Sequence, residues 1–325
     1  MWASGQSADH LAAAVGEHPV LDLLAICSDA HPGADIPAQT DLARTVQSVV
    51  TLAPDCVLYL PRHYDTDTVC RLLMAGINVI TTRSELHHPD SMEPTVLARL
   101  ESACWAGRAS LYSTGVSPAF VTELMPITIG AIQSRIENVS IEEYTDLTGH
   151  EPTSPPPGLA RFGTPCPTHM DHRALIHFQQ NFGPSLRLIA DGLGLAVDTV
   201  EVSGDYAATR GGTAHIPAAT VGALRMSLVG SHLGITRVTY RATWYCTRNL
   251  EPAWRLEPNG WRATITGDPT PMEITVRSAF PLGAPYEPVP THTAHRAART
   301  IPFLCMAPPG IRTSLELPPS TVSTR

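Results

Sequence analysis

Cys56-Val-Leu-Tyr-Leu60, Ile77-Asn-Val-Ile80 and Ala109-Ser-Leu-Tyr112 are three short apolar runs, and helical patterns separate them. Thr66–Ala75 places apolar side chains at helical spacing after an acidic start, and Pro94–Ala106 forms a second such pattern. This alternation predicts a parallel sheet with helices on its faces, an α/β fold. Ligands bind such sheets beyond the carboxyl ends of the strands, so the residues that follow each run are the first candidates for a functional site.

Length and charge exclude several classes of protein. The chain has 325 residues, enough for two domains, and its net charge of −8 comes without any basic run. We therefore expect neither nucleic acid nor a membrane as a partner, and no apolar stretch reaches the ~20 residues that a membrane span needs. The first residues lack the basic and apolar regions of a secretory signal, which favours a cytoplasmic protein.

The absence of lysine and the spacing of the cysteines restrict the chemistry. Without lysine, the chain has no Schiff-base lysine, no P-loop lysine and no catalytic ammonium group. The seven cysteines include no CxxC pair, so reduced and mostly buried thiols are favoured over disulfides or a zinc site. We expect no bound metal.

The N-terminal segment matches part of a nucleotide-binding unit. Trp2-Ala-Ser-Gly-Gln-Ser-Ala8 supplies a turn, Asp9–Gly16 predicts a helix and Leu21–Ile26 predicts a strand. Asp29 follows at the distance of the acidic residue that such units carry about 20 residues after the turn. Nothing before Trp2 could form the first strand, so we expect that strand to be missing and cofactor binding to be weakened.

The second half predicts a separate antiparallel sheet. Val139–Thr145 alternates as a half-exposed strand with Glu142 and Glu143 on opposite faces, and a solvated face is favoured over one that lines a cleft. Glu151–Pro167 is rich in Pro, Gly, Ser and Thr and predicts a long loop. The other predicted elements are helices at Glu123–Ser134, Ser185–Leu195 and Thr291–Arg299 and strands at Val197–Val202, Ser227–Val229, Ile235–Tyr245 and Trp261–Thr266.

Five segments carry a resemblance to a known family, in the same order along the chain. They are Leu58–His63, Gly76–Thr82, Ser113–Phe120, Gly192–Leu195 and Ile301–Gly310. Together they resemble the dihydrodipicolinate-reductase-like superfamily, and most closely its branch of 2,4-diaminopentanoate dehydrogenase and the native amine dehydrogenases. The chain departs from the family in its first turn, where Ala3 and Ala8 replace two of three glycines.

The resemblance implies two domains and a nicotinamide cofactor. A Rossmann dinucleotide-binding domain would comprise residues 1–115, completed by residues 290–325. Residues 116–289 would form an α+β domain for substrate binding and dimerisation, so a homodimer is expected. NAD or NADP would be the cofactor. The residues implied to bind it are Ser4, Gly5, Gln6, Asp29, Arg62, His63, Thr81, Thr82, Thr114 and Gly115. The alternative to cofactor binding is that these residues form ordinary strand-to-helix turns and that Arg62 forms a surface ion pair.

Glu85 is the implied catalytic residue. A glutamate in this region of the amine dehydrogenases binds the substrate amine and helps to move a proton, and a carboxylate suits both tasks. The alternative is a solvated Glu at the start of a helix. His88, Ser117 and Pro118 are implied to contact substrate. The His-His pair of dihydrodipicolinate reductases lies in their second domain, so we interpret His87-His88 as a coincidence of order.

These observations predict an NAD(P)-dependent oxidoreductase that acts on a C–N bond. Its substrate would be a small-molecule amine, imine or carbonyl compound. One alternative is a reductase of cyclic imines, which the absence of lysine disfavours. Another is a non-catalytic relic of the Rossmann fold with impaired cofactor binding.

Overall fold

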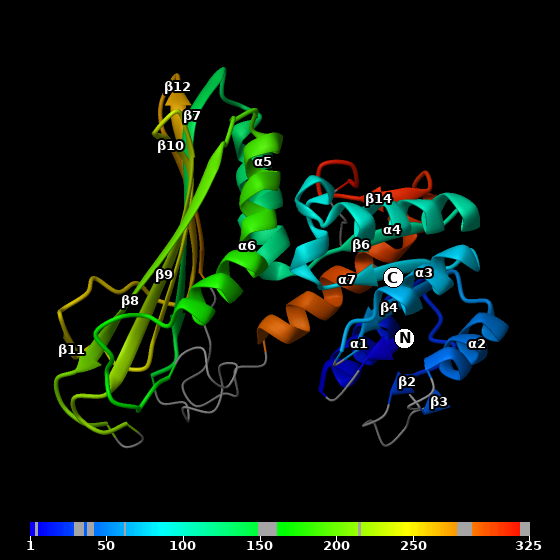
Figure 1. The fold of residues 1–325 in the computed structure, drawn as a ribbon, viewed down its shortest axis with the longest axis horizontal. Coiled ribbons are helices and arrows are strands. Elements are labelled where there is room, and N and C mark those ends of the chain that lie inside the picture. Colours follow the sequence, from blue (N-terminus) through cyan, green and yellow to red (C-terminus); the bar gives the residue numbers. More distant parts are fainter. Residues whose placement is uncertain are drawn as a thin grey trace. The chain divides into compact units, whose positions relative to one another are not determined.

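The computed structural model divides the chain into two compact units, described here separately. The first unit comprises Met1–Phe120 and Pro288–Arg325, and the second comprises Val121–Glu287 (Figure 1). The structure describes residues 1–3, 6–28, 36–37, 42–61, 63–148, 161–213, 216–277 and 288–318. Within these ranges, no helix is both long and apolar enough to cross a membrane.

A parallel sheet forms the centre of the first unit, and its strand pairs all run in the same direction. In spatial order its strands are β14 (Gly310–Arg312), β6 (Ser110–Ser113), β5 (Asn78–Thr81), β4 (Cys56–Leu60), β1 (Trp2–Ala3), β2 (Cys27–Ser28) and β3 (Ile36–Pro37). The α/β class and the parallel sheet predicted from the sequence are therefore confirmed.

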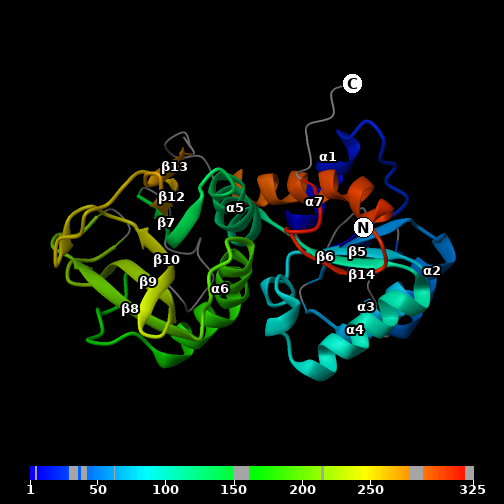
Figure 2. The ribbon, with the colours of Figure 1, turned by 90° about the horizontal axis from the view of Figure 1, so that it is seen from above.

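Helices cover both faces of this sheet (Figure 2). They are α1 (Gln6–Gly16), α2 (Leu42–Leu52), α3 (Thr66–Met74), α4 (Pro94–Gly107) and α7 (Pro288–Met306). One apolar cluster joins α1 and α7 to Leu58 and Ile80, and a second joins α2, α3 and α4 to Val57, Tyr59 and Val79. The faces alternate because successive side chains of a strand point to opposite sides of the sheet.

Local sequence sets both ends of α3, the helix that follows β4. Asp65 caps α3 by accepting a hydrogen bond from the backbone N–H of Thr68 at 2.8 Å. Beyond the end of α3, Gly76 has φ of +83°, a conformation that glycine adopts without strain. The chain then enters β5 directly, which brings the end of that strand to the same sheet edge as the end of β4.

The expectation of a missing first strand is wrong. Trp2 and Ala3 form the short strand β1 themselves, paired in parallel with Cys27 on one side and with Tyr59 and Leu60 on the other. Leu21–Ile26, which we expected to be the second strand, has no regular structure, and the strand β2 follows it. Strands of two residues show no apolar periodicity, so the sequence pattern does not reveal them.

The second unit is built on a mixed sheet. In spatial order its strands are β11 (Leu250–Glu251), β8 (Thr199–Thr209), β9 (Val221–His232), β10 (Ile235–Tyr245), β7 (Arg135–Asp146), β12 (Gly260–Asp268) and β13 (Met272–Arg277). The predicted antiparallel pairing is confirmed for β8, β9 and β10, whereas β7, for which no direction was predicted, pairs in parallel with β10 and antiparallel with β12. The helix α6 (His172–Gly192) packs its apolar residues against one face.

The segment that enters the second unit differs from the single helix predicted at Glu123–Ser134. Val116–Leu124 has the hydrogen-bonding pattern of a π-helix but contains three residues with non-helical backbone, and the helix α5 then covers only Met125–Gly130. Most of the predicted loop at Glu151–Pro167 lies outside the described residues, and its last part, residues 161–167, is irregular.

Candidate functional site

The strand order places a candidate binding site at the carboxyl ends of β1 and β4. From β1 the chain builds the sheet in one direction through β2 and β3, and from β4 it builds in the other through β5 and β6. The point where the order reverses is where doubly wound sheets bind dinucleotides. Of the predicted residues at this point, Ser4, Gly5, Asp29 and Arg62 lie outside the described residues, and His63 is exposed.

The start of α1 fits the pyrophosphate of a dinucleotide. Gln6 begins this helix three positions after the last residue of β1, so the N-terminal end of the helix, which attracts anions, lies at the reversal point. Ala3 is extended within β1, where a Cβ causes no strain, and Ala8 is fully buried in the cluster that joins α1 to the sheet. The two alanines are therefore compatible with close packing of α1 against the sheet.

The ends of β5 and β6 are tied together at the same edge. The backbone N–H of Thr114 donates to the carbonyl oxygen of Thr81 at 2.9 Å. The hydroxyl of Ser113 donates to the carbonyl oxygen of Arg83 at 2.6 Å. Thr81 and Thr114 are both 1% exposed, and Oγ1 of Thr114 is buried without a hydrogen-bond partner in the described part of the chain. A buried hydroxyl of this kind requires an explanation, and a polar ligand group is one.

The turn after β6 holds the backbone close to itself. A Cβ added at Gly115 would lie 3.1 Å from the carbonyl oxygen of Pro118, which is tighter than ordinary contacts. Ala119 has φ of 133°, a value that residues with a side chain rarely adopt, and it is buried. Strained backbone is concentrated at ligand-binding sites, so this turn is a second part of the candidate site.

Glu85 presents its carboxylate to solvent from a short 3₁₀ turn, Ser84–Leu86. Its neighbours Ser84 and Leu86 are buried, whereas Glu85 is exposed. Within the described residues, its carboxylate forms no hydrogen bond or ion pair. The turn is thus anchored by its flanking residues while the charged group remains accessible to a ligand.

Tyr64 and Arg83 link the loops after β4 and β5, and the sequence analysis did not identify either. The Arg83 guanidinium lies over the Tyr64 ring at 5.5 Å, and Tyr64 makes an edge contact with Tyr59 at 6.0 Å. Burial raises the pKa of Tyr64, and the charge of Glu85 adds to the rise. Tyr64 thus lies close enough to Glu85 for the charge of that carboxylate to act on its hydroxyl.

The two histidines after Glu85 are buried. His87 is 2% exposed, and His88 is 7% exposed with Nδ1 2.6 Å from the Ser91 hydroxyl. The three side chains of Glu85, His87 and His88 do not gather into a group that could hold a metal ion. Ser117 and Pro118, also implied to contact substrate, are half-buried in the turn after β6.

The second unit contains a buried carboxylate, Glu143, to which the sequence analysis assigned no role. Glu143 is 7% exposed and accepts hydrogen bonds from the Tyr240 hydroxyl at 2.8 Å and from two indole N–H groups, Trp244 at 3.2 Å and Trp261 at 2.8 Å. Glu143 shares the buried face of β7 with Val139 and Ile141, so in the sequence it interrupts the alternation of apolar and polar residues. The sequence pattern does not reveal the hydrogen-bond partners of Glu143, because they come from β10 and β12.

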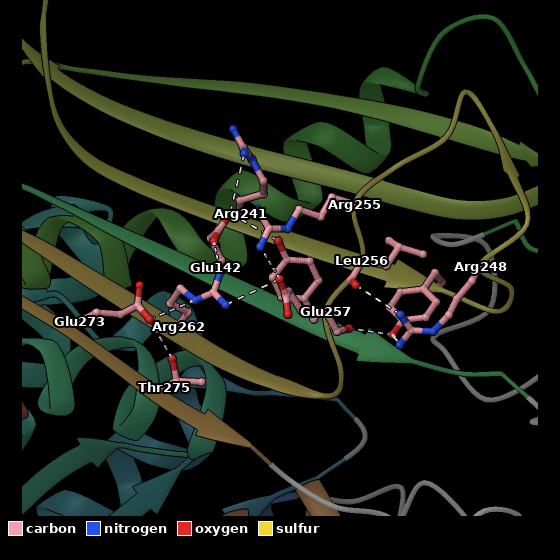
Figure 3. Close-up of polar contacts among 11 residues, drawn as sticks. Glu142, Arg241, Arg248, Arg255, Leu256, Glu257, Arg262, Glu273 and Thr275 are labelled. Carbon is pink, nitrogen blue, oxygen red and sulfur yellow. Dashed lines mark hydrogen bonds and ion pairs between the residues drawn. The ribbon is translucent and has the colours of Figure 1, made fainter.

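The opposite face of this sheet carries a network of ion pairs (Figure 3). Glu142 lies 3.5 Å from Arg262 and 3.9 Å from Arg241, and Arg262 lies 3.5 Å from Glu273. Glu257 extends the network to Arg255 at 3.3 Å and to Arg262 at 3.8 Å. The solvated face favoured from the sequence is thus a charged face whose arginines and glutamates are arranged in pairs.

The strand order and the second, mixed sheet define a Rossmann-type α/β fold. No model of a protein family matches the chain. An amine dehydrogenase from Streptomyces virginiae is 22% identical to it over 348 residues, covering 98% of this chain and 95% of that protein.

Solved structures share the fold over nearly the whole chain. Amine dehydrogenase from Mycobacterium smegmatis matches with a TM-score of 0.72 at 14% identity, covering 99% of this chain and 96% of that one. The structure of GenD2 from gentamicin A biosynthesis, in complex with NAD, matches with a TM-score of 0.54 at 12% identity, covering 94% and 85% of the two chains.

Proposed function

We propose that the protein is an NAD(P)-dependent oxidoreductase that interconverts a small-molecule amine and the corresponding imine or carbonyl compound. The observation that carries this proposal is the similarity to an amine dehydrogenase over 98% of the chain. It is supported by a sheet whose strand order reverses between β1 and β4, as in dinucleotide-binding domains. On this proposal the first unit holds the cofactor and the second contributes to substrate binding.

The cofactor would lie along the carboxyl edge of the first unit's sheet. The start of α1, with Ser4, Gly5 and Gln6, suits the pyrophosphate, and Asp29 suits a ribose hydroxyl. Arg62 and His63 would add polar contacts. When bound, the nicotinamide accepts or donates the hydride. Residues of the β5 and β6 ends would position its ring, namely Thr81, Thr82, Thr114 and Gly115.

Glu85 would bind the substrate ammonium and take up its proton. An exposed carboxylate attracts a cation, and substrate binding would remove water from it and make it a stronger base. Tyr64 and Arg83 would fix the loops on which it stands. His88, Ser117 and Pro118 would form part of the substrate surface.

The two alternatives have less support. Reduction of a cyclic imine remains disfavoured because the chain has no lysine. The non-catalytic relic was inferred from a missing first strand, and Trp2–Ala3 supply that strand. The exposed carboxylate of Glu85 beside a dinucleotide-type sheet edge favours the enzyme.

Direct binding and turnover measurements test the proposal. Titration with NADH and with NADPH, followed by nicotinamide fluorescence, should give saturable binding, with NADH preferred because Asp29 repels a 2′-phosphate. Incubation with NAD and a panel of primary amines should then produce absorbance at 340 nm. If neither nucleotide bound, the proposal would be overturned and the alternative of a non-catalytic Rossmann-fold relic would be favoured.

We also propose a homodimer located in the cytosol. The resemblance assigns the dimer contact to the second domain, and the charged face of its sheet offers paired arginines and glutamates for such a contact. The seven cysteines are free thiols, which suits a reducing compartment.

A further inference from the structure

Two thiols lie together at the amino-terminal edge of the first unit's sheet. Cys56 is the first residue of β4, and Cys305 lies in the last turn of α7. The sulfur of Cys305 lies 3.8 Å from the carbonyl oxygen of Asp55, the residue before Cys56, and 3.7 Å from the amide nitrogen of Asn78, which pairs with Cys56 between β4 and β5. Cys305 is exposed and Cys56 is partly exposed, so a small oxidant can reach the pair. The candidate cofactor site lies at the opposite, carboxyl-terminal edge.

The groups around Cys305 act on its thiol in both directions: its sulfur donates to the Asp55 carbonyl oxygen at 3.8 Å, but the net effect lowers its pKa. The amide of Asn78 approaches its sulfur at 3.7 Å and is itself held in place, with Nδ2 2.9 Å from the Asp55 carbonyl oxygen and Oδ1 accepting from the Ser110 N–H at 2.8 Å. The neighbouring Cys56 thiol lowers the pKa of Cys305, and Asn78 assists, although burial and Asp55 oppose them. The Cys305 thiol, together with burial, raises the pKa of Cys56.

This arrangement matches what a redox-sensitive thiol requires. Such cysteines are accessible, have a stabilised thiolate and stand beside a second thiol that can resolve the oxidised form. The other five cysteines lack this combination. Cys27, Cys70, Cys104 and Cys246 are buried, and Cys166 is partly exposed with its pKa raised by burial.

We propose that Cys56 and Cys305 form a peroxide-sensitive dithiol that closes reversibly to a disulfide. The Cys305 thiolate attacks one oxygen of hydrogen peroxide, the O–O bond breaks, and the departing hydroxide takes up a proton to become water. Cys56 then loses its proton and attacks the sulfenic sulfur of Cys305. The S–S bond forms as the S–O bond breaks, and the hydroxyl leaves as a second water. Two thiols are oxidised by two electrons in total, and one peroxide is reduced.

The disulfide would join the end of α7 to the start of the central strand β4. Ala307 and two prolines follow Cys305, so the end of the helix is followed by a segment that does not continue it. Closing the disulfide would bring the two sulfurs to the bond length of about 2.05 Å and fix the end of the helix to the start of β4. A thiol reductant would restore the dithiol.

Peptide mapping provides the test, and the absence of lysine simplifies it. Trypsin cleaves this chain only after arginine, so Cys56 falls in peptide 45–62 and Cys305 in peptide 300–312, each with one cysteine. The reduced full-length protein is treated with one equivalent of hydrogen peroxide, alkylated and digested without reductant. We expect a species equal to the two peptides minus two hydrogens, which dithiothreitol removes.

Three variants distinguish the proposal from general oxidation. Cys166→Ser should form the cross-linked peptide as the wild type does. Cys56→Ser should leave a sulfenic acid on Cys305 that dimedone traps, and Cys305→Ser should show neither product. Iodoacetamide at pH 7 should alkylate Cys305 at least about tenfold faster than Cys166. A wild type in which Cys305 gains oxygen without any cross-link, or reacts no faster than Cys166, would overturn the proposal.

Discussion

The residues around Glu85 differ sharply in exposure over a very short distance. Glu85 is exposed, whereas Ser84, Leu86, His87 and His88 are buried. The buried neighbours hold the turn in place, and the carboxylate is left available. A charge that is fixed in position and forms no ion pair within the described residues suits recognition of a cationic ligand, since no such pair has to be broken first.

Glu85→Gln should lower amine turnover by a factor of roughly 10² to 10⁴, the usual contribution of a general base. The amide is nearly isosteric and the side chain is exposed, so the melting temperature and the NADH dissociation constant should not change. Steady-state kinetics with and without the substitution measure the effect. Asp90→Asn, an exposed acidic residue five positions later, is the matched control and should retain full turnover.

His88→Ala provides the contrasting result. Because His88 is buried and contacts Ser91, this change should lower the melting temperature while a substantial part of the turnover remains. If Glu85→Gln kept near-full activity and His88→Ala abolished it in a protein that still folds, the histidine would carry the chemistry.

Gly115→Ala should weaken nucleotide binding and destabilise the first unit by about 1 kcal/mol, since a Cβ would lie 3.1 Å from the Pro118 carbonyl oxygen. Gly16→Ala is the control, because a Cβ at the end of α1 meets no atom within 4 Å. Chemical denaturation and NADH titration of both variants measure the difference. Equal behaviour of the two would show that the turn after β6 adapts easily.

Among the elements, the end of β7 is held to β10 by a charged hydrogen-bond cluster. Asp146 accepts from the Tyr245 hydroxyl at 2.8 Å, from Arg248 at 3.1 Å and from the Thr148 N–H at 2.9 Å. Burial alone would raise the pKa of Asp146, but these donors outweigh it and the pKa is lowered. The folded state therefore favours the ionised form more than the unfolded state does.

Asp146→Asn should cost on the order of 1 kcal/mol of unfolding free energy at pH 7. The stabilisation is present above the unfolded pKa of about 3.9 and is lost as pH falls through the lower folded value. The difference between the two proteins should thus shrink below about pH 4 in urea denaturation. Asp205→Asn, on an exposed position of β8, should show no such dependence; a constant difference at every pH would mean that Asp146 contributes by packing alone.

Sequence reasoning located β4, α3, β5, α4 and β6 because each is a local pattern bounded by Pro, Gly or an acidic cap. It started the helix α6 at Ser185 and ended α7 at Arg299 because Pro184 and Pro302 read as breaks, whereas both prolines lie inside helices in the structure. The parallel pairing of β7 with β10 has no local signal. At the candidate site, the contact between Tyr64 and Arg83 likewise has no local signal, because the two residues lie in separate loops.

For the molecule as a whole, the charged face of the second sheet is the dimer contact that we propose. Arg241 lies on this face with 43% of its side chain exposed and within 3.9 Å of Glu142. If this face forms the dimer contact, Arg241→Glu should convert the dimer to a monomer in size-exclusion chromatography with light scattering, because it places like charges together. Arg71→Glu on α3 is the control. A wild type that is monomeric, or a folded Arg241→Glu protein that stays dimeric, would contradict this assignment.

The insertion of the second unit also sets the order in which the protein can be completed during synthesis. The hydroxyl of Ser110 in β6 donates to the carbonyl oxygen of Pro308 just before β14, a contact between residues 198 positions apart. At ~5–20 residues per second, a ribosome needs roughly 10 to 40 seconds to add that length of chain. Throughout this interval β6 is an unpaired edge of the nascent first unit while the second unit emerges and folds. An edge of this kind is a template for aggregation, so we expect translation speed and chaperone supply to limit the yield of this protein in cells.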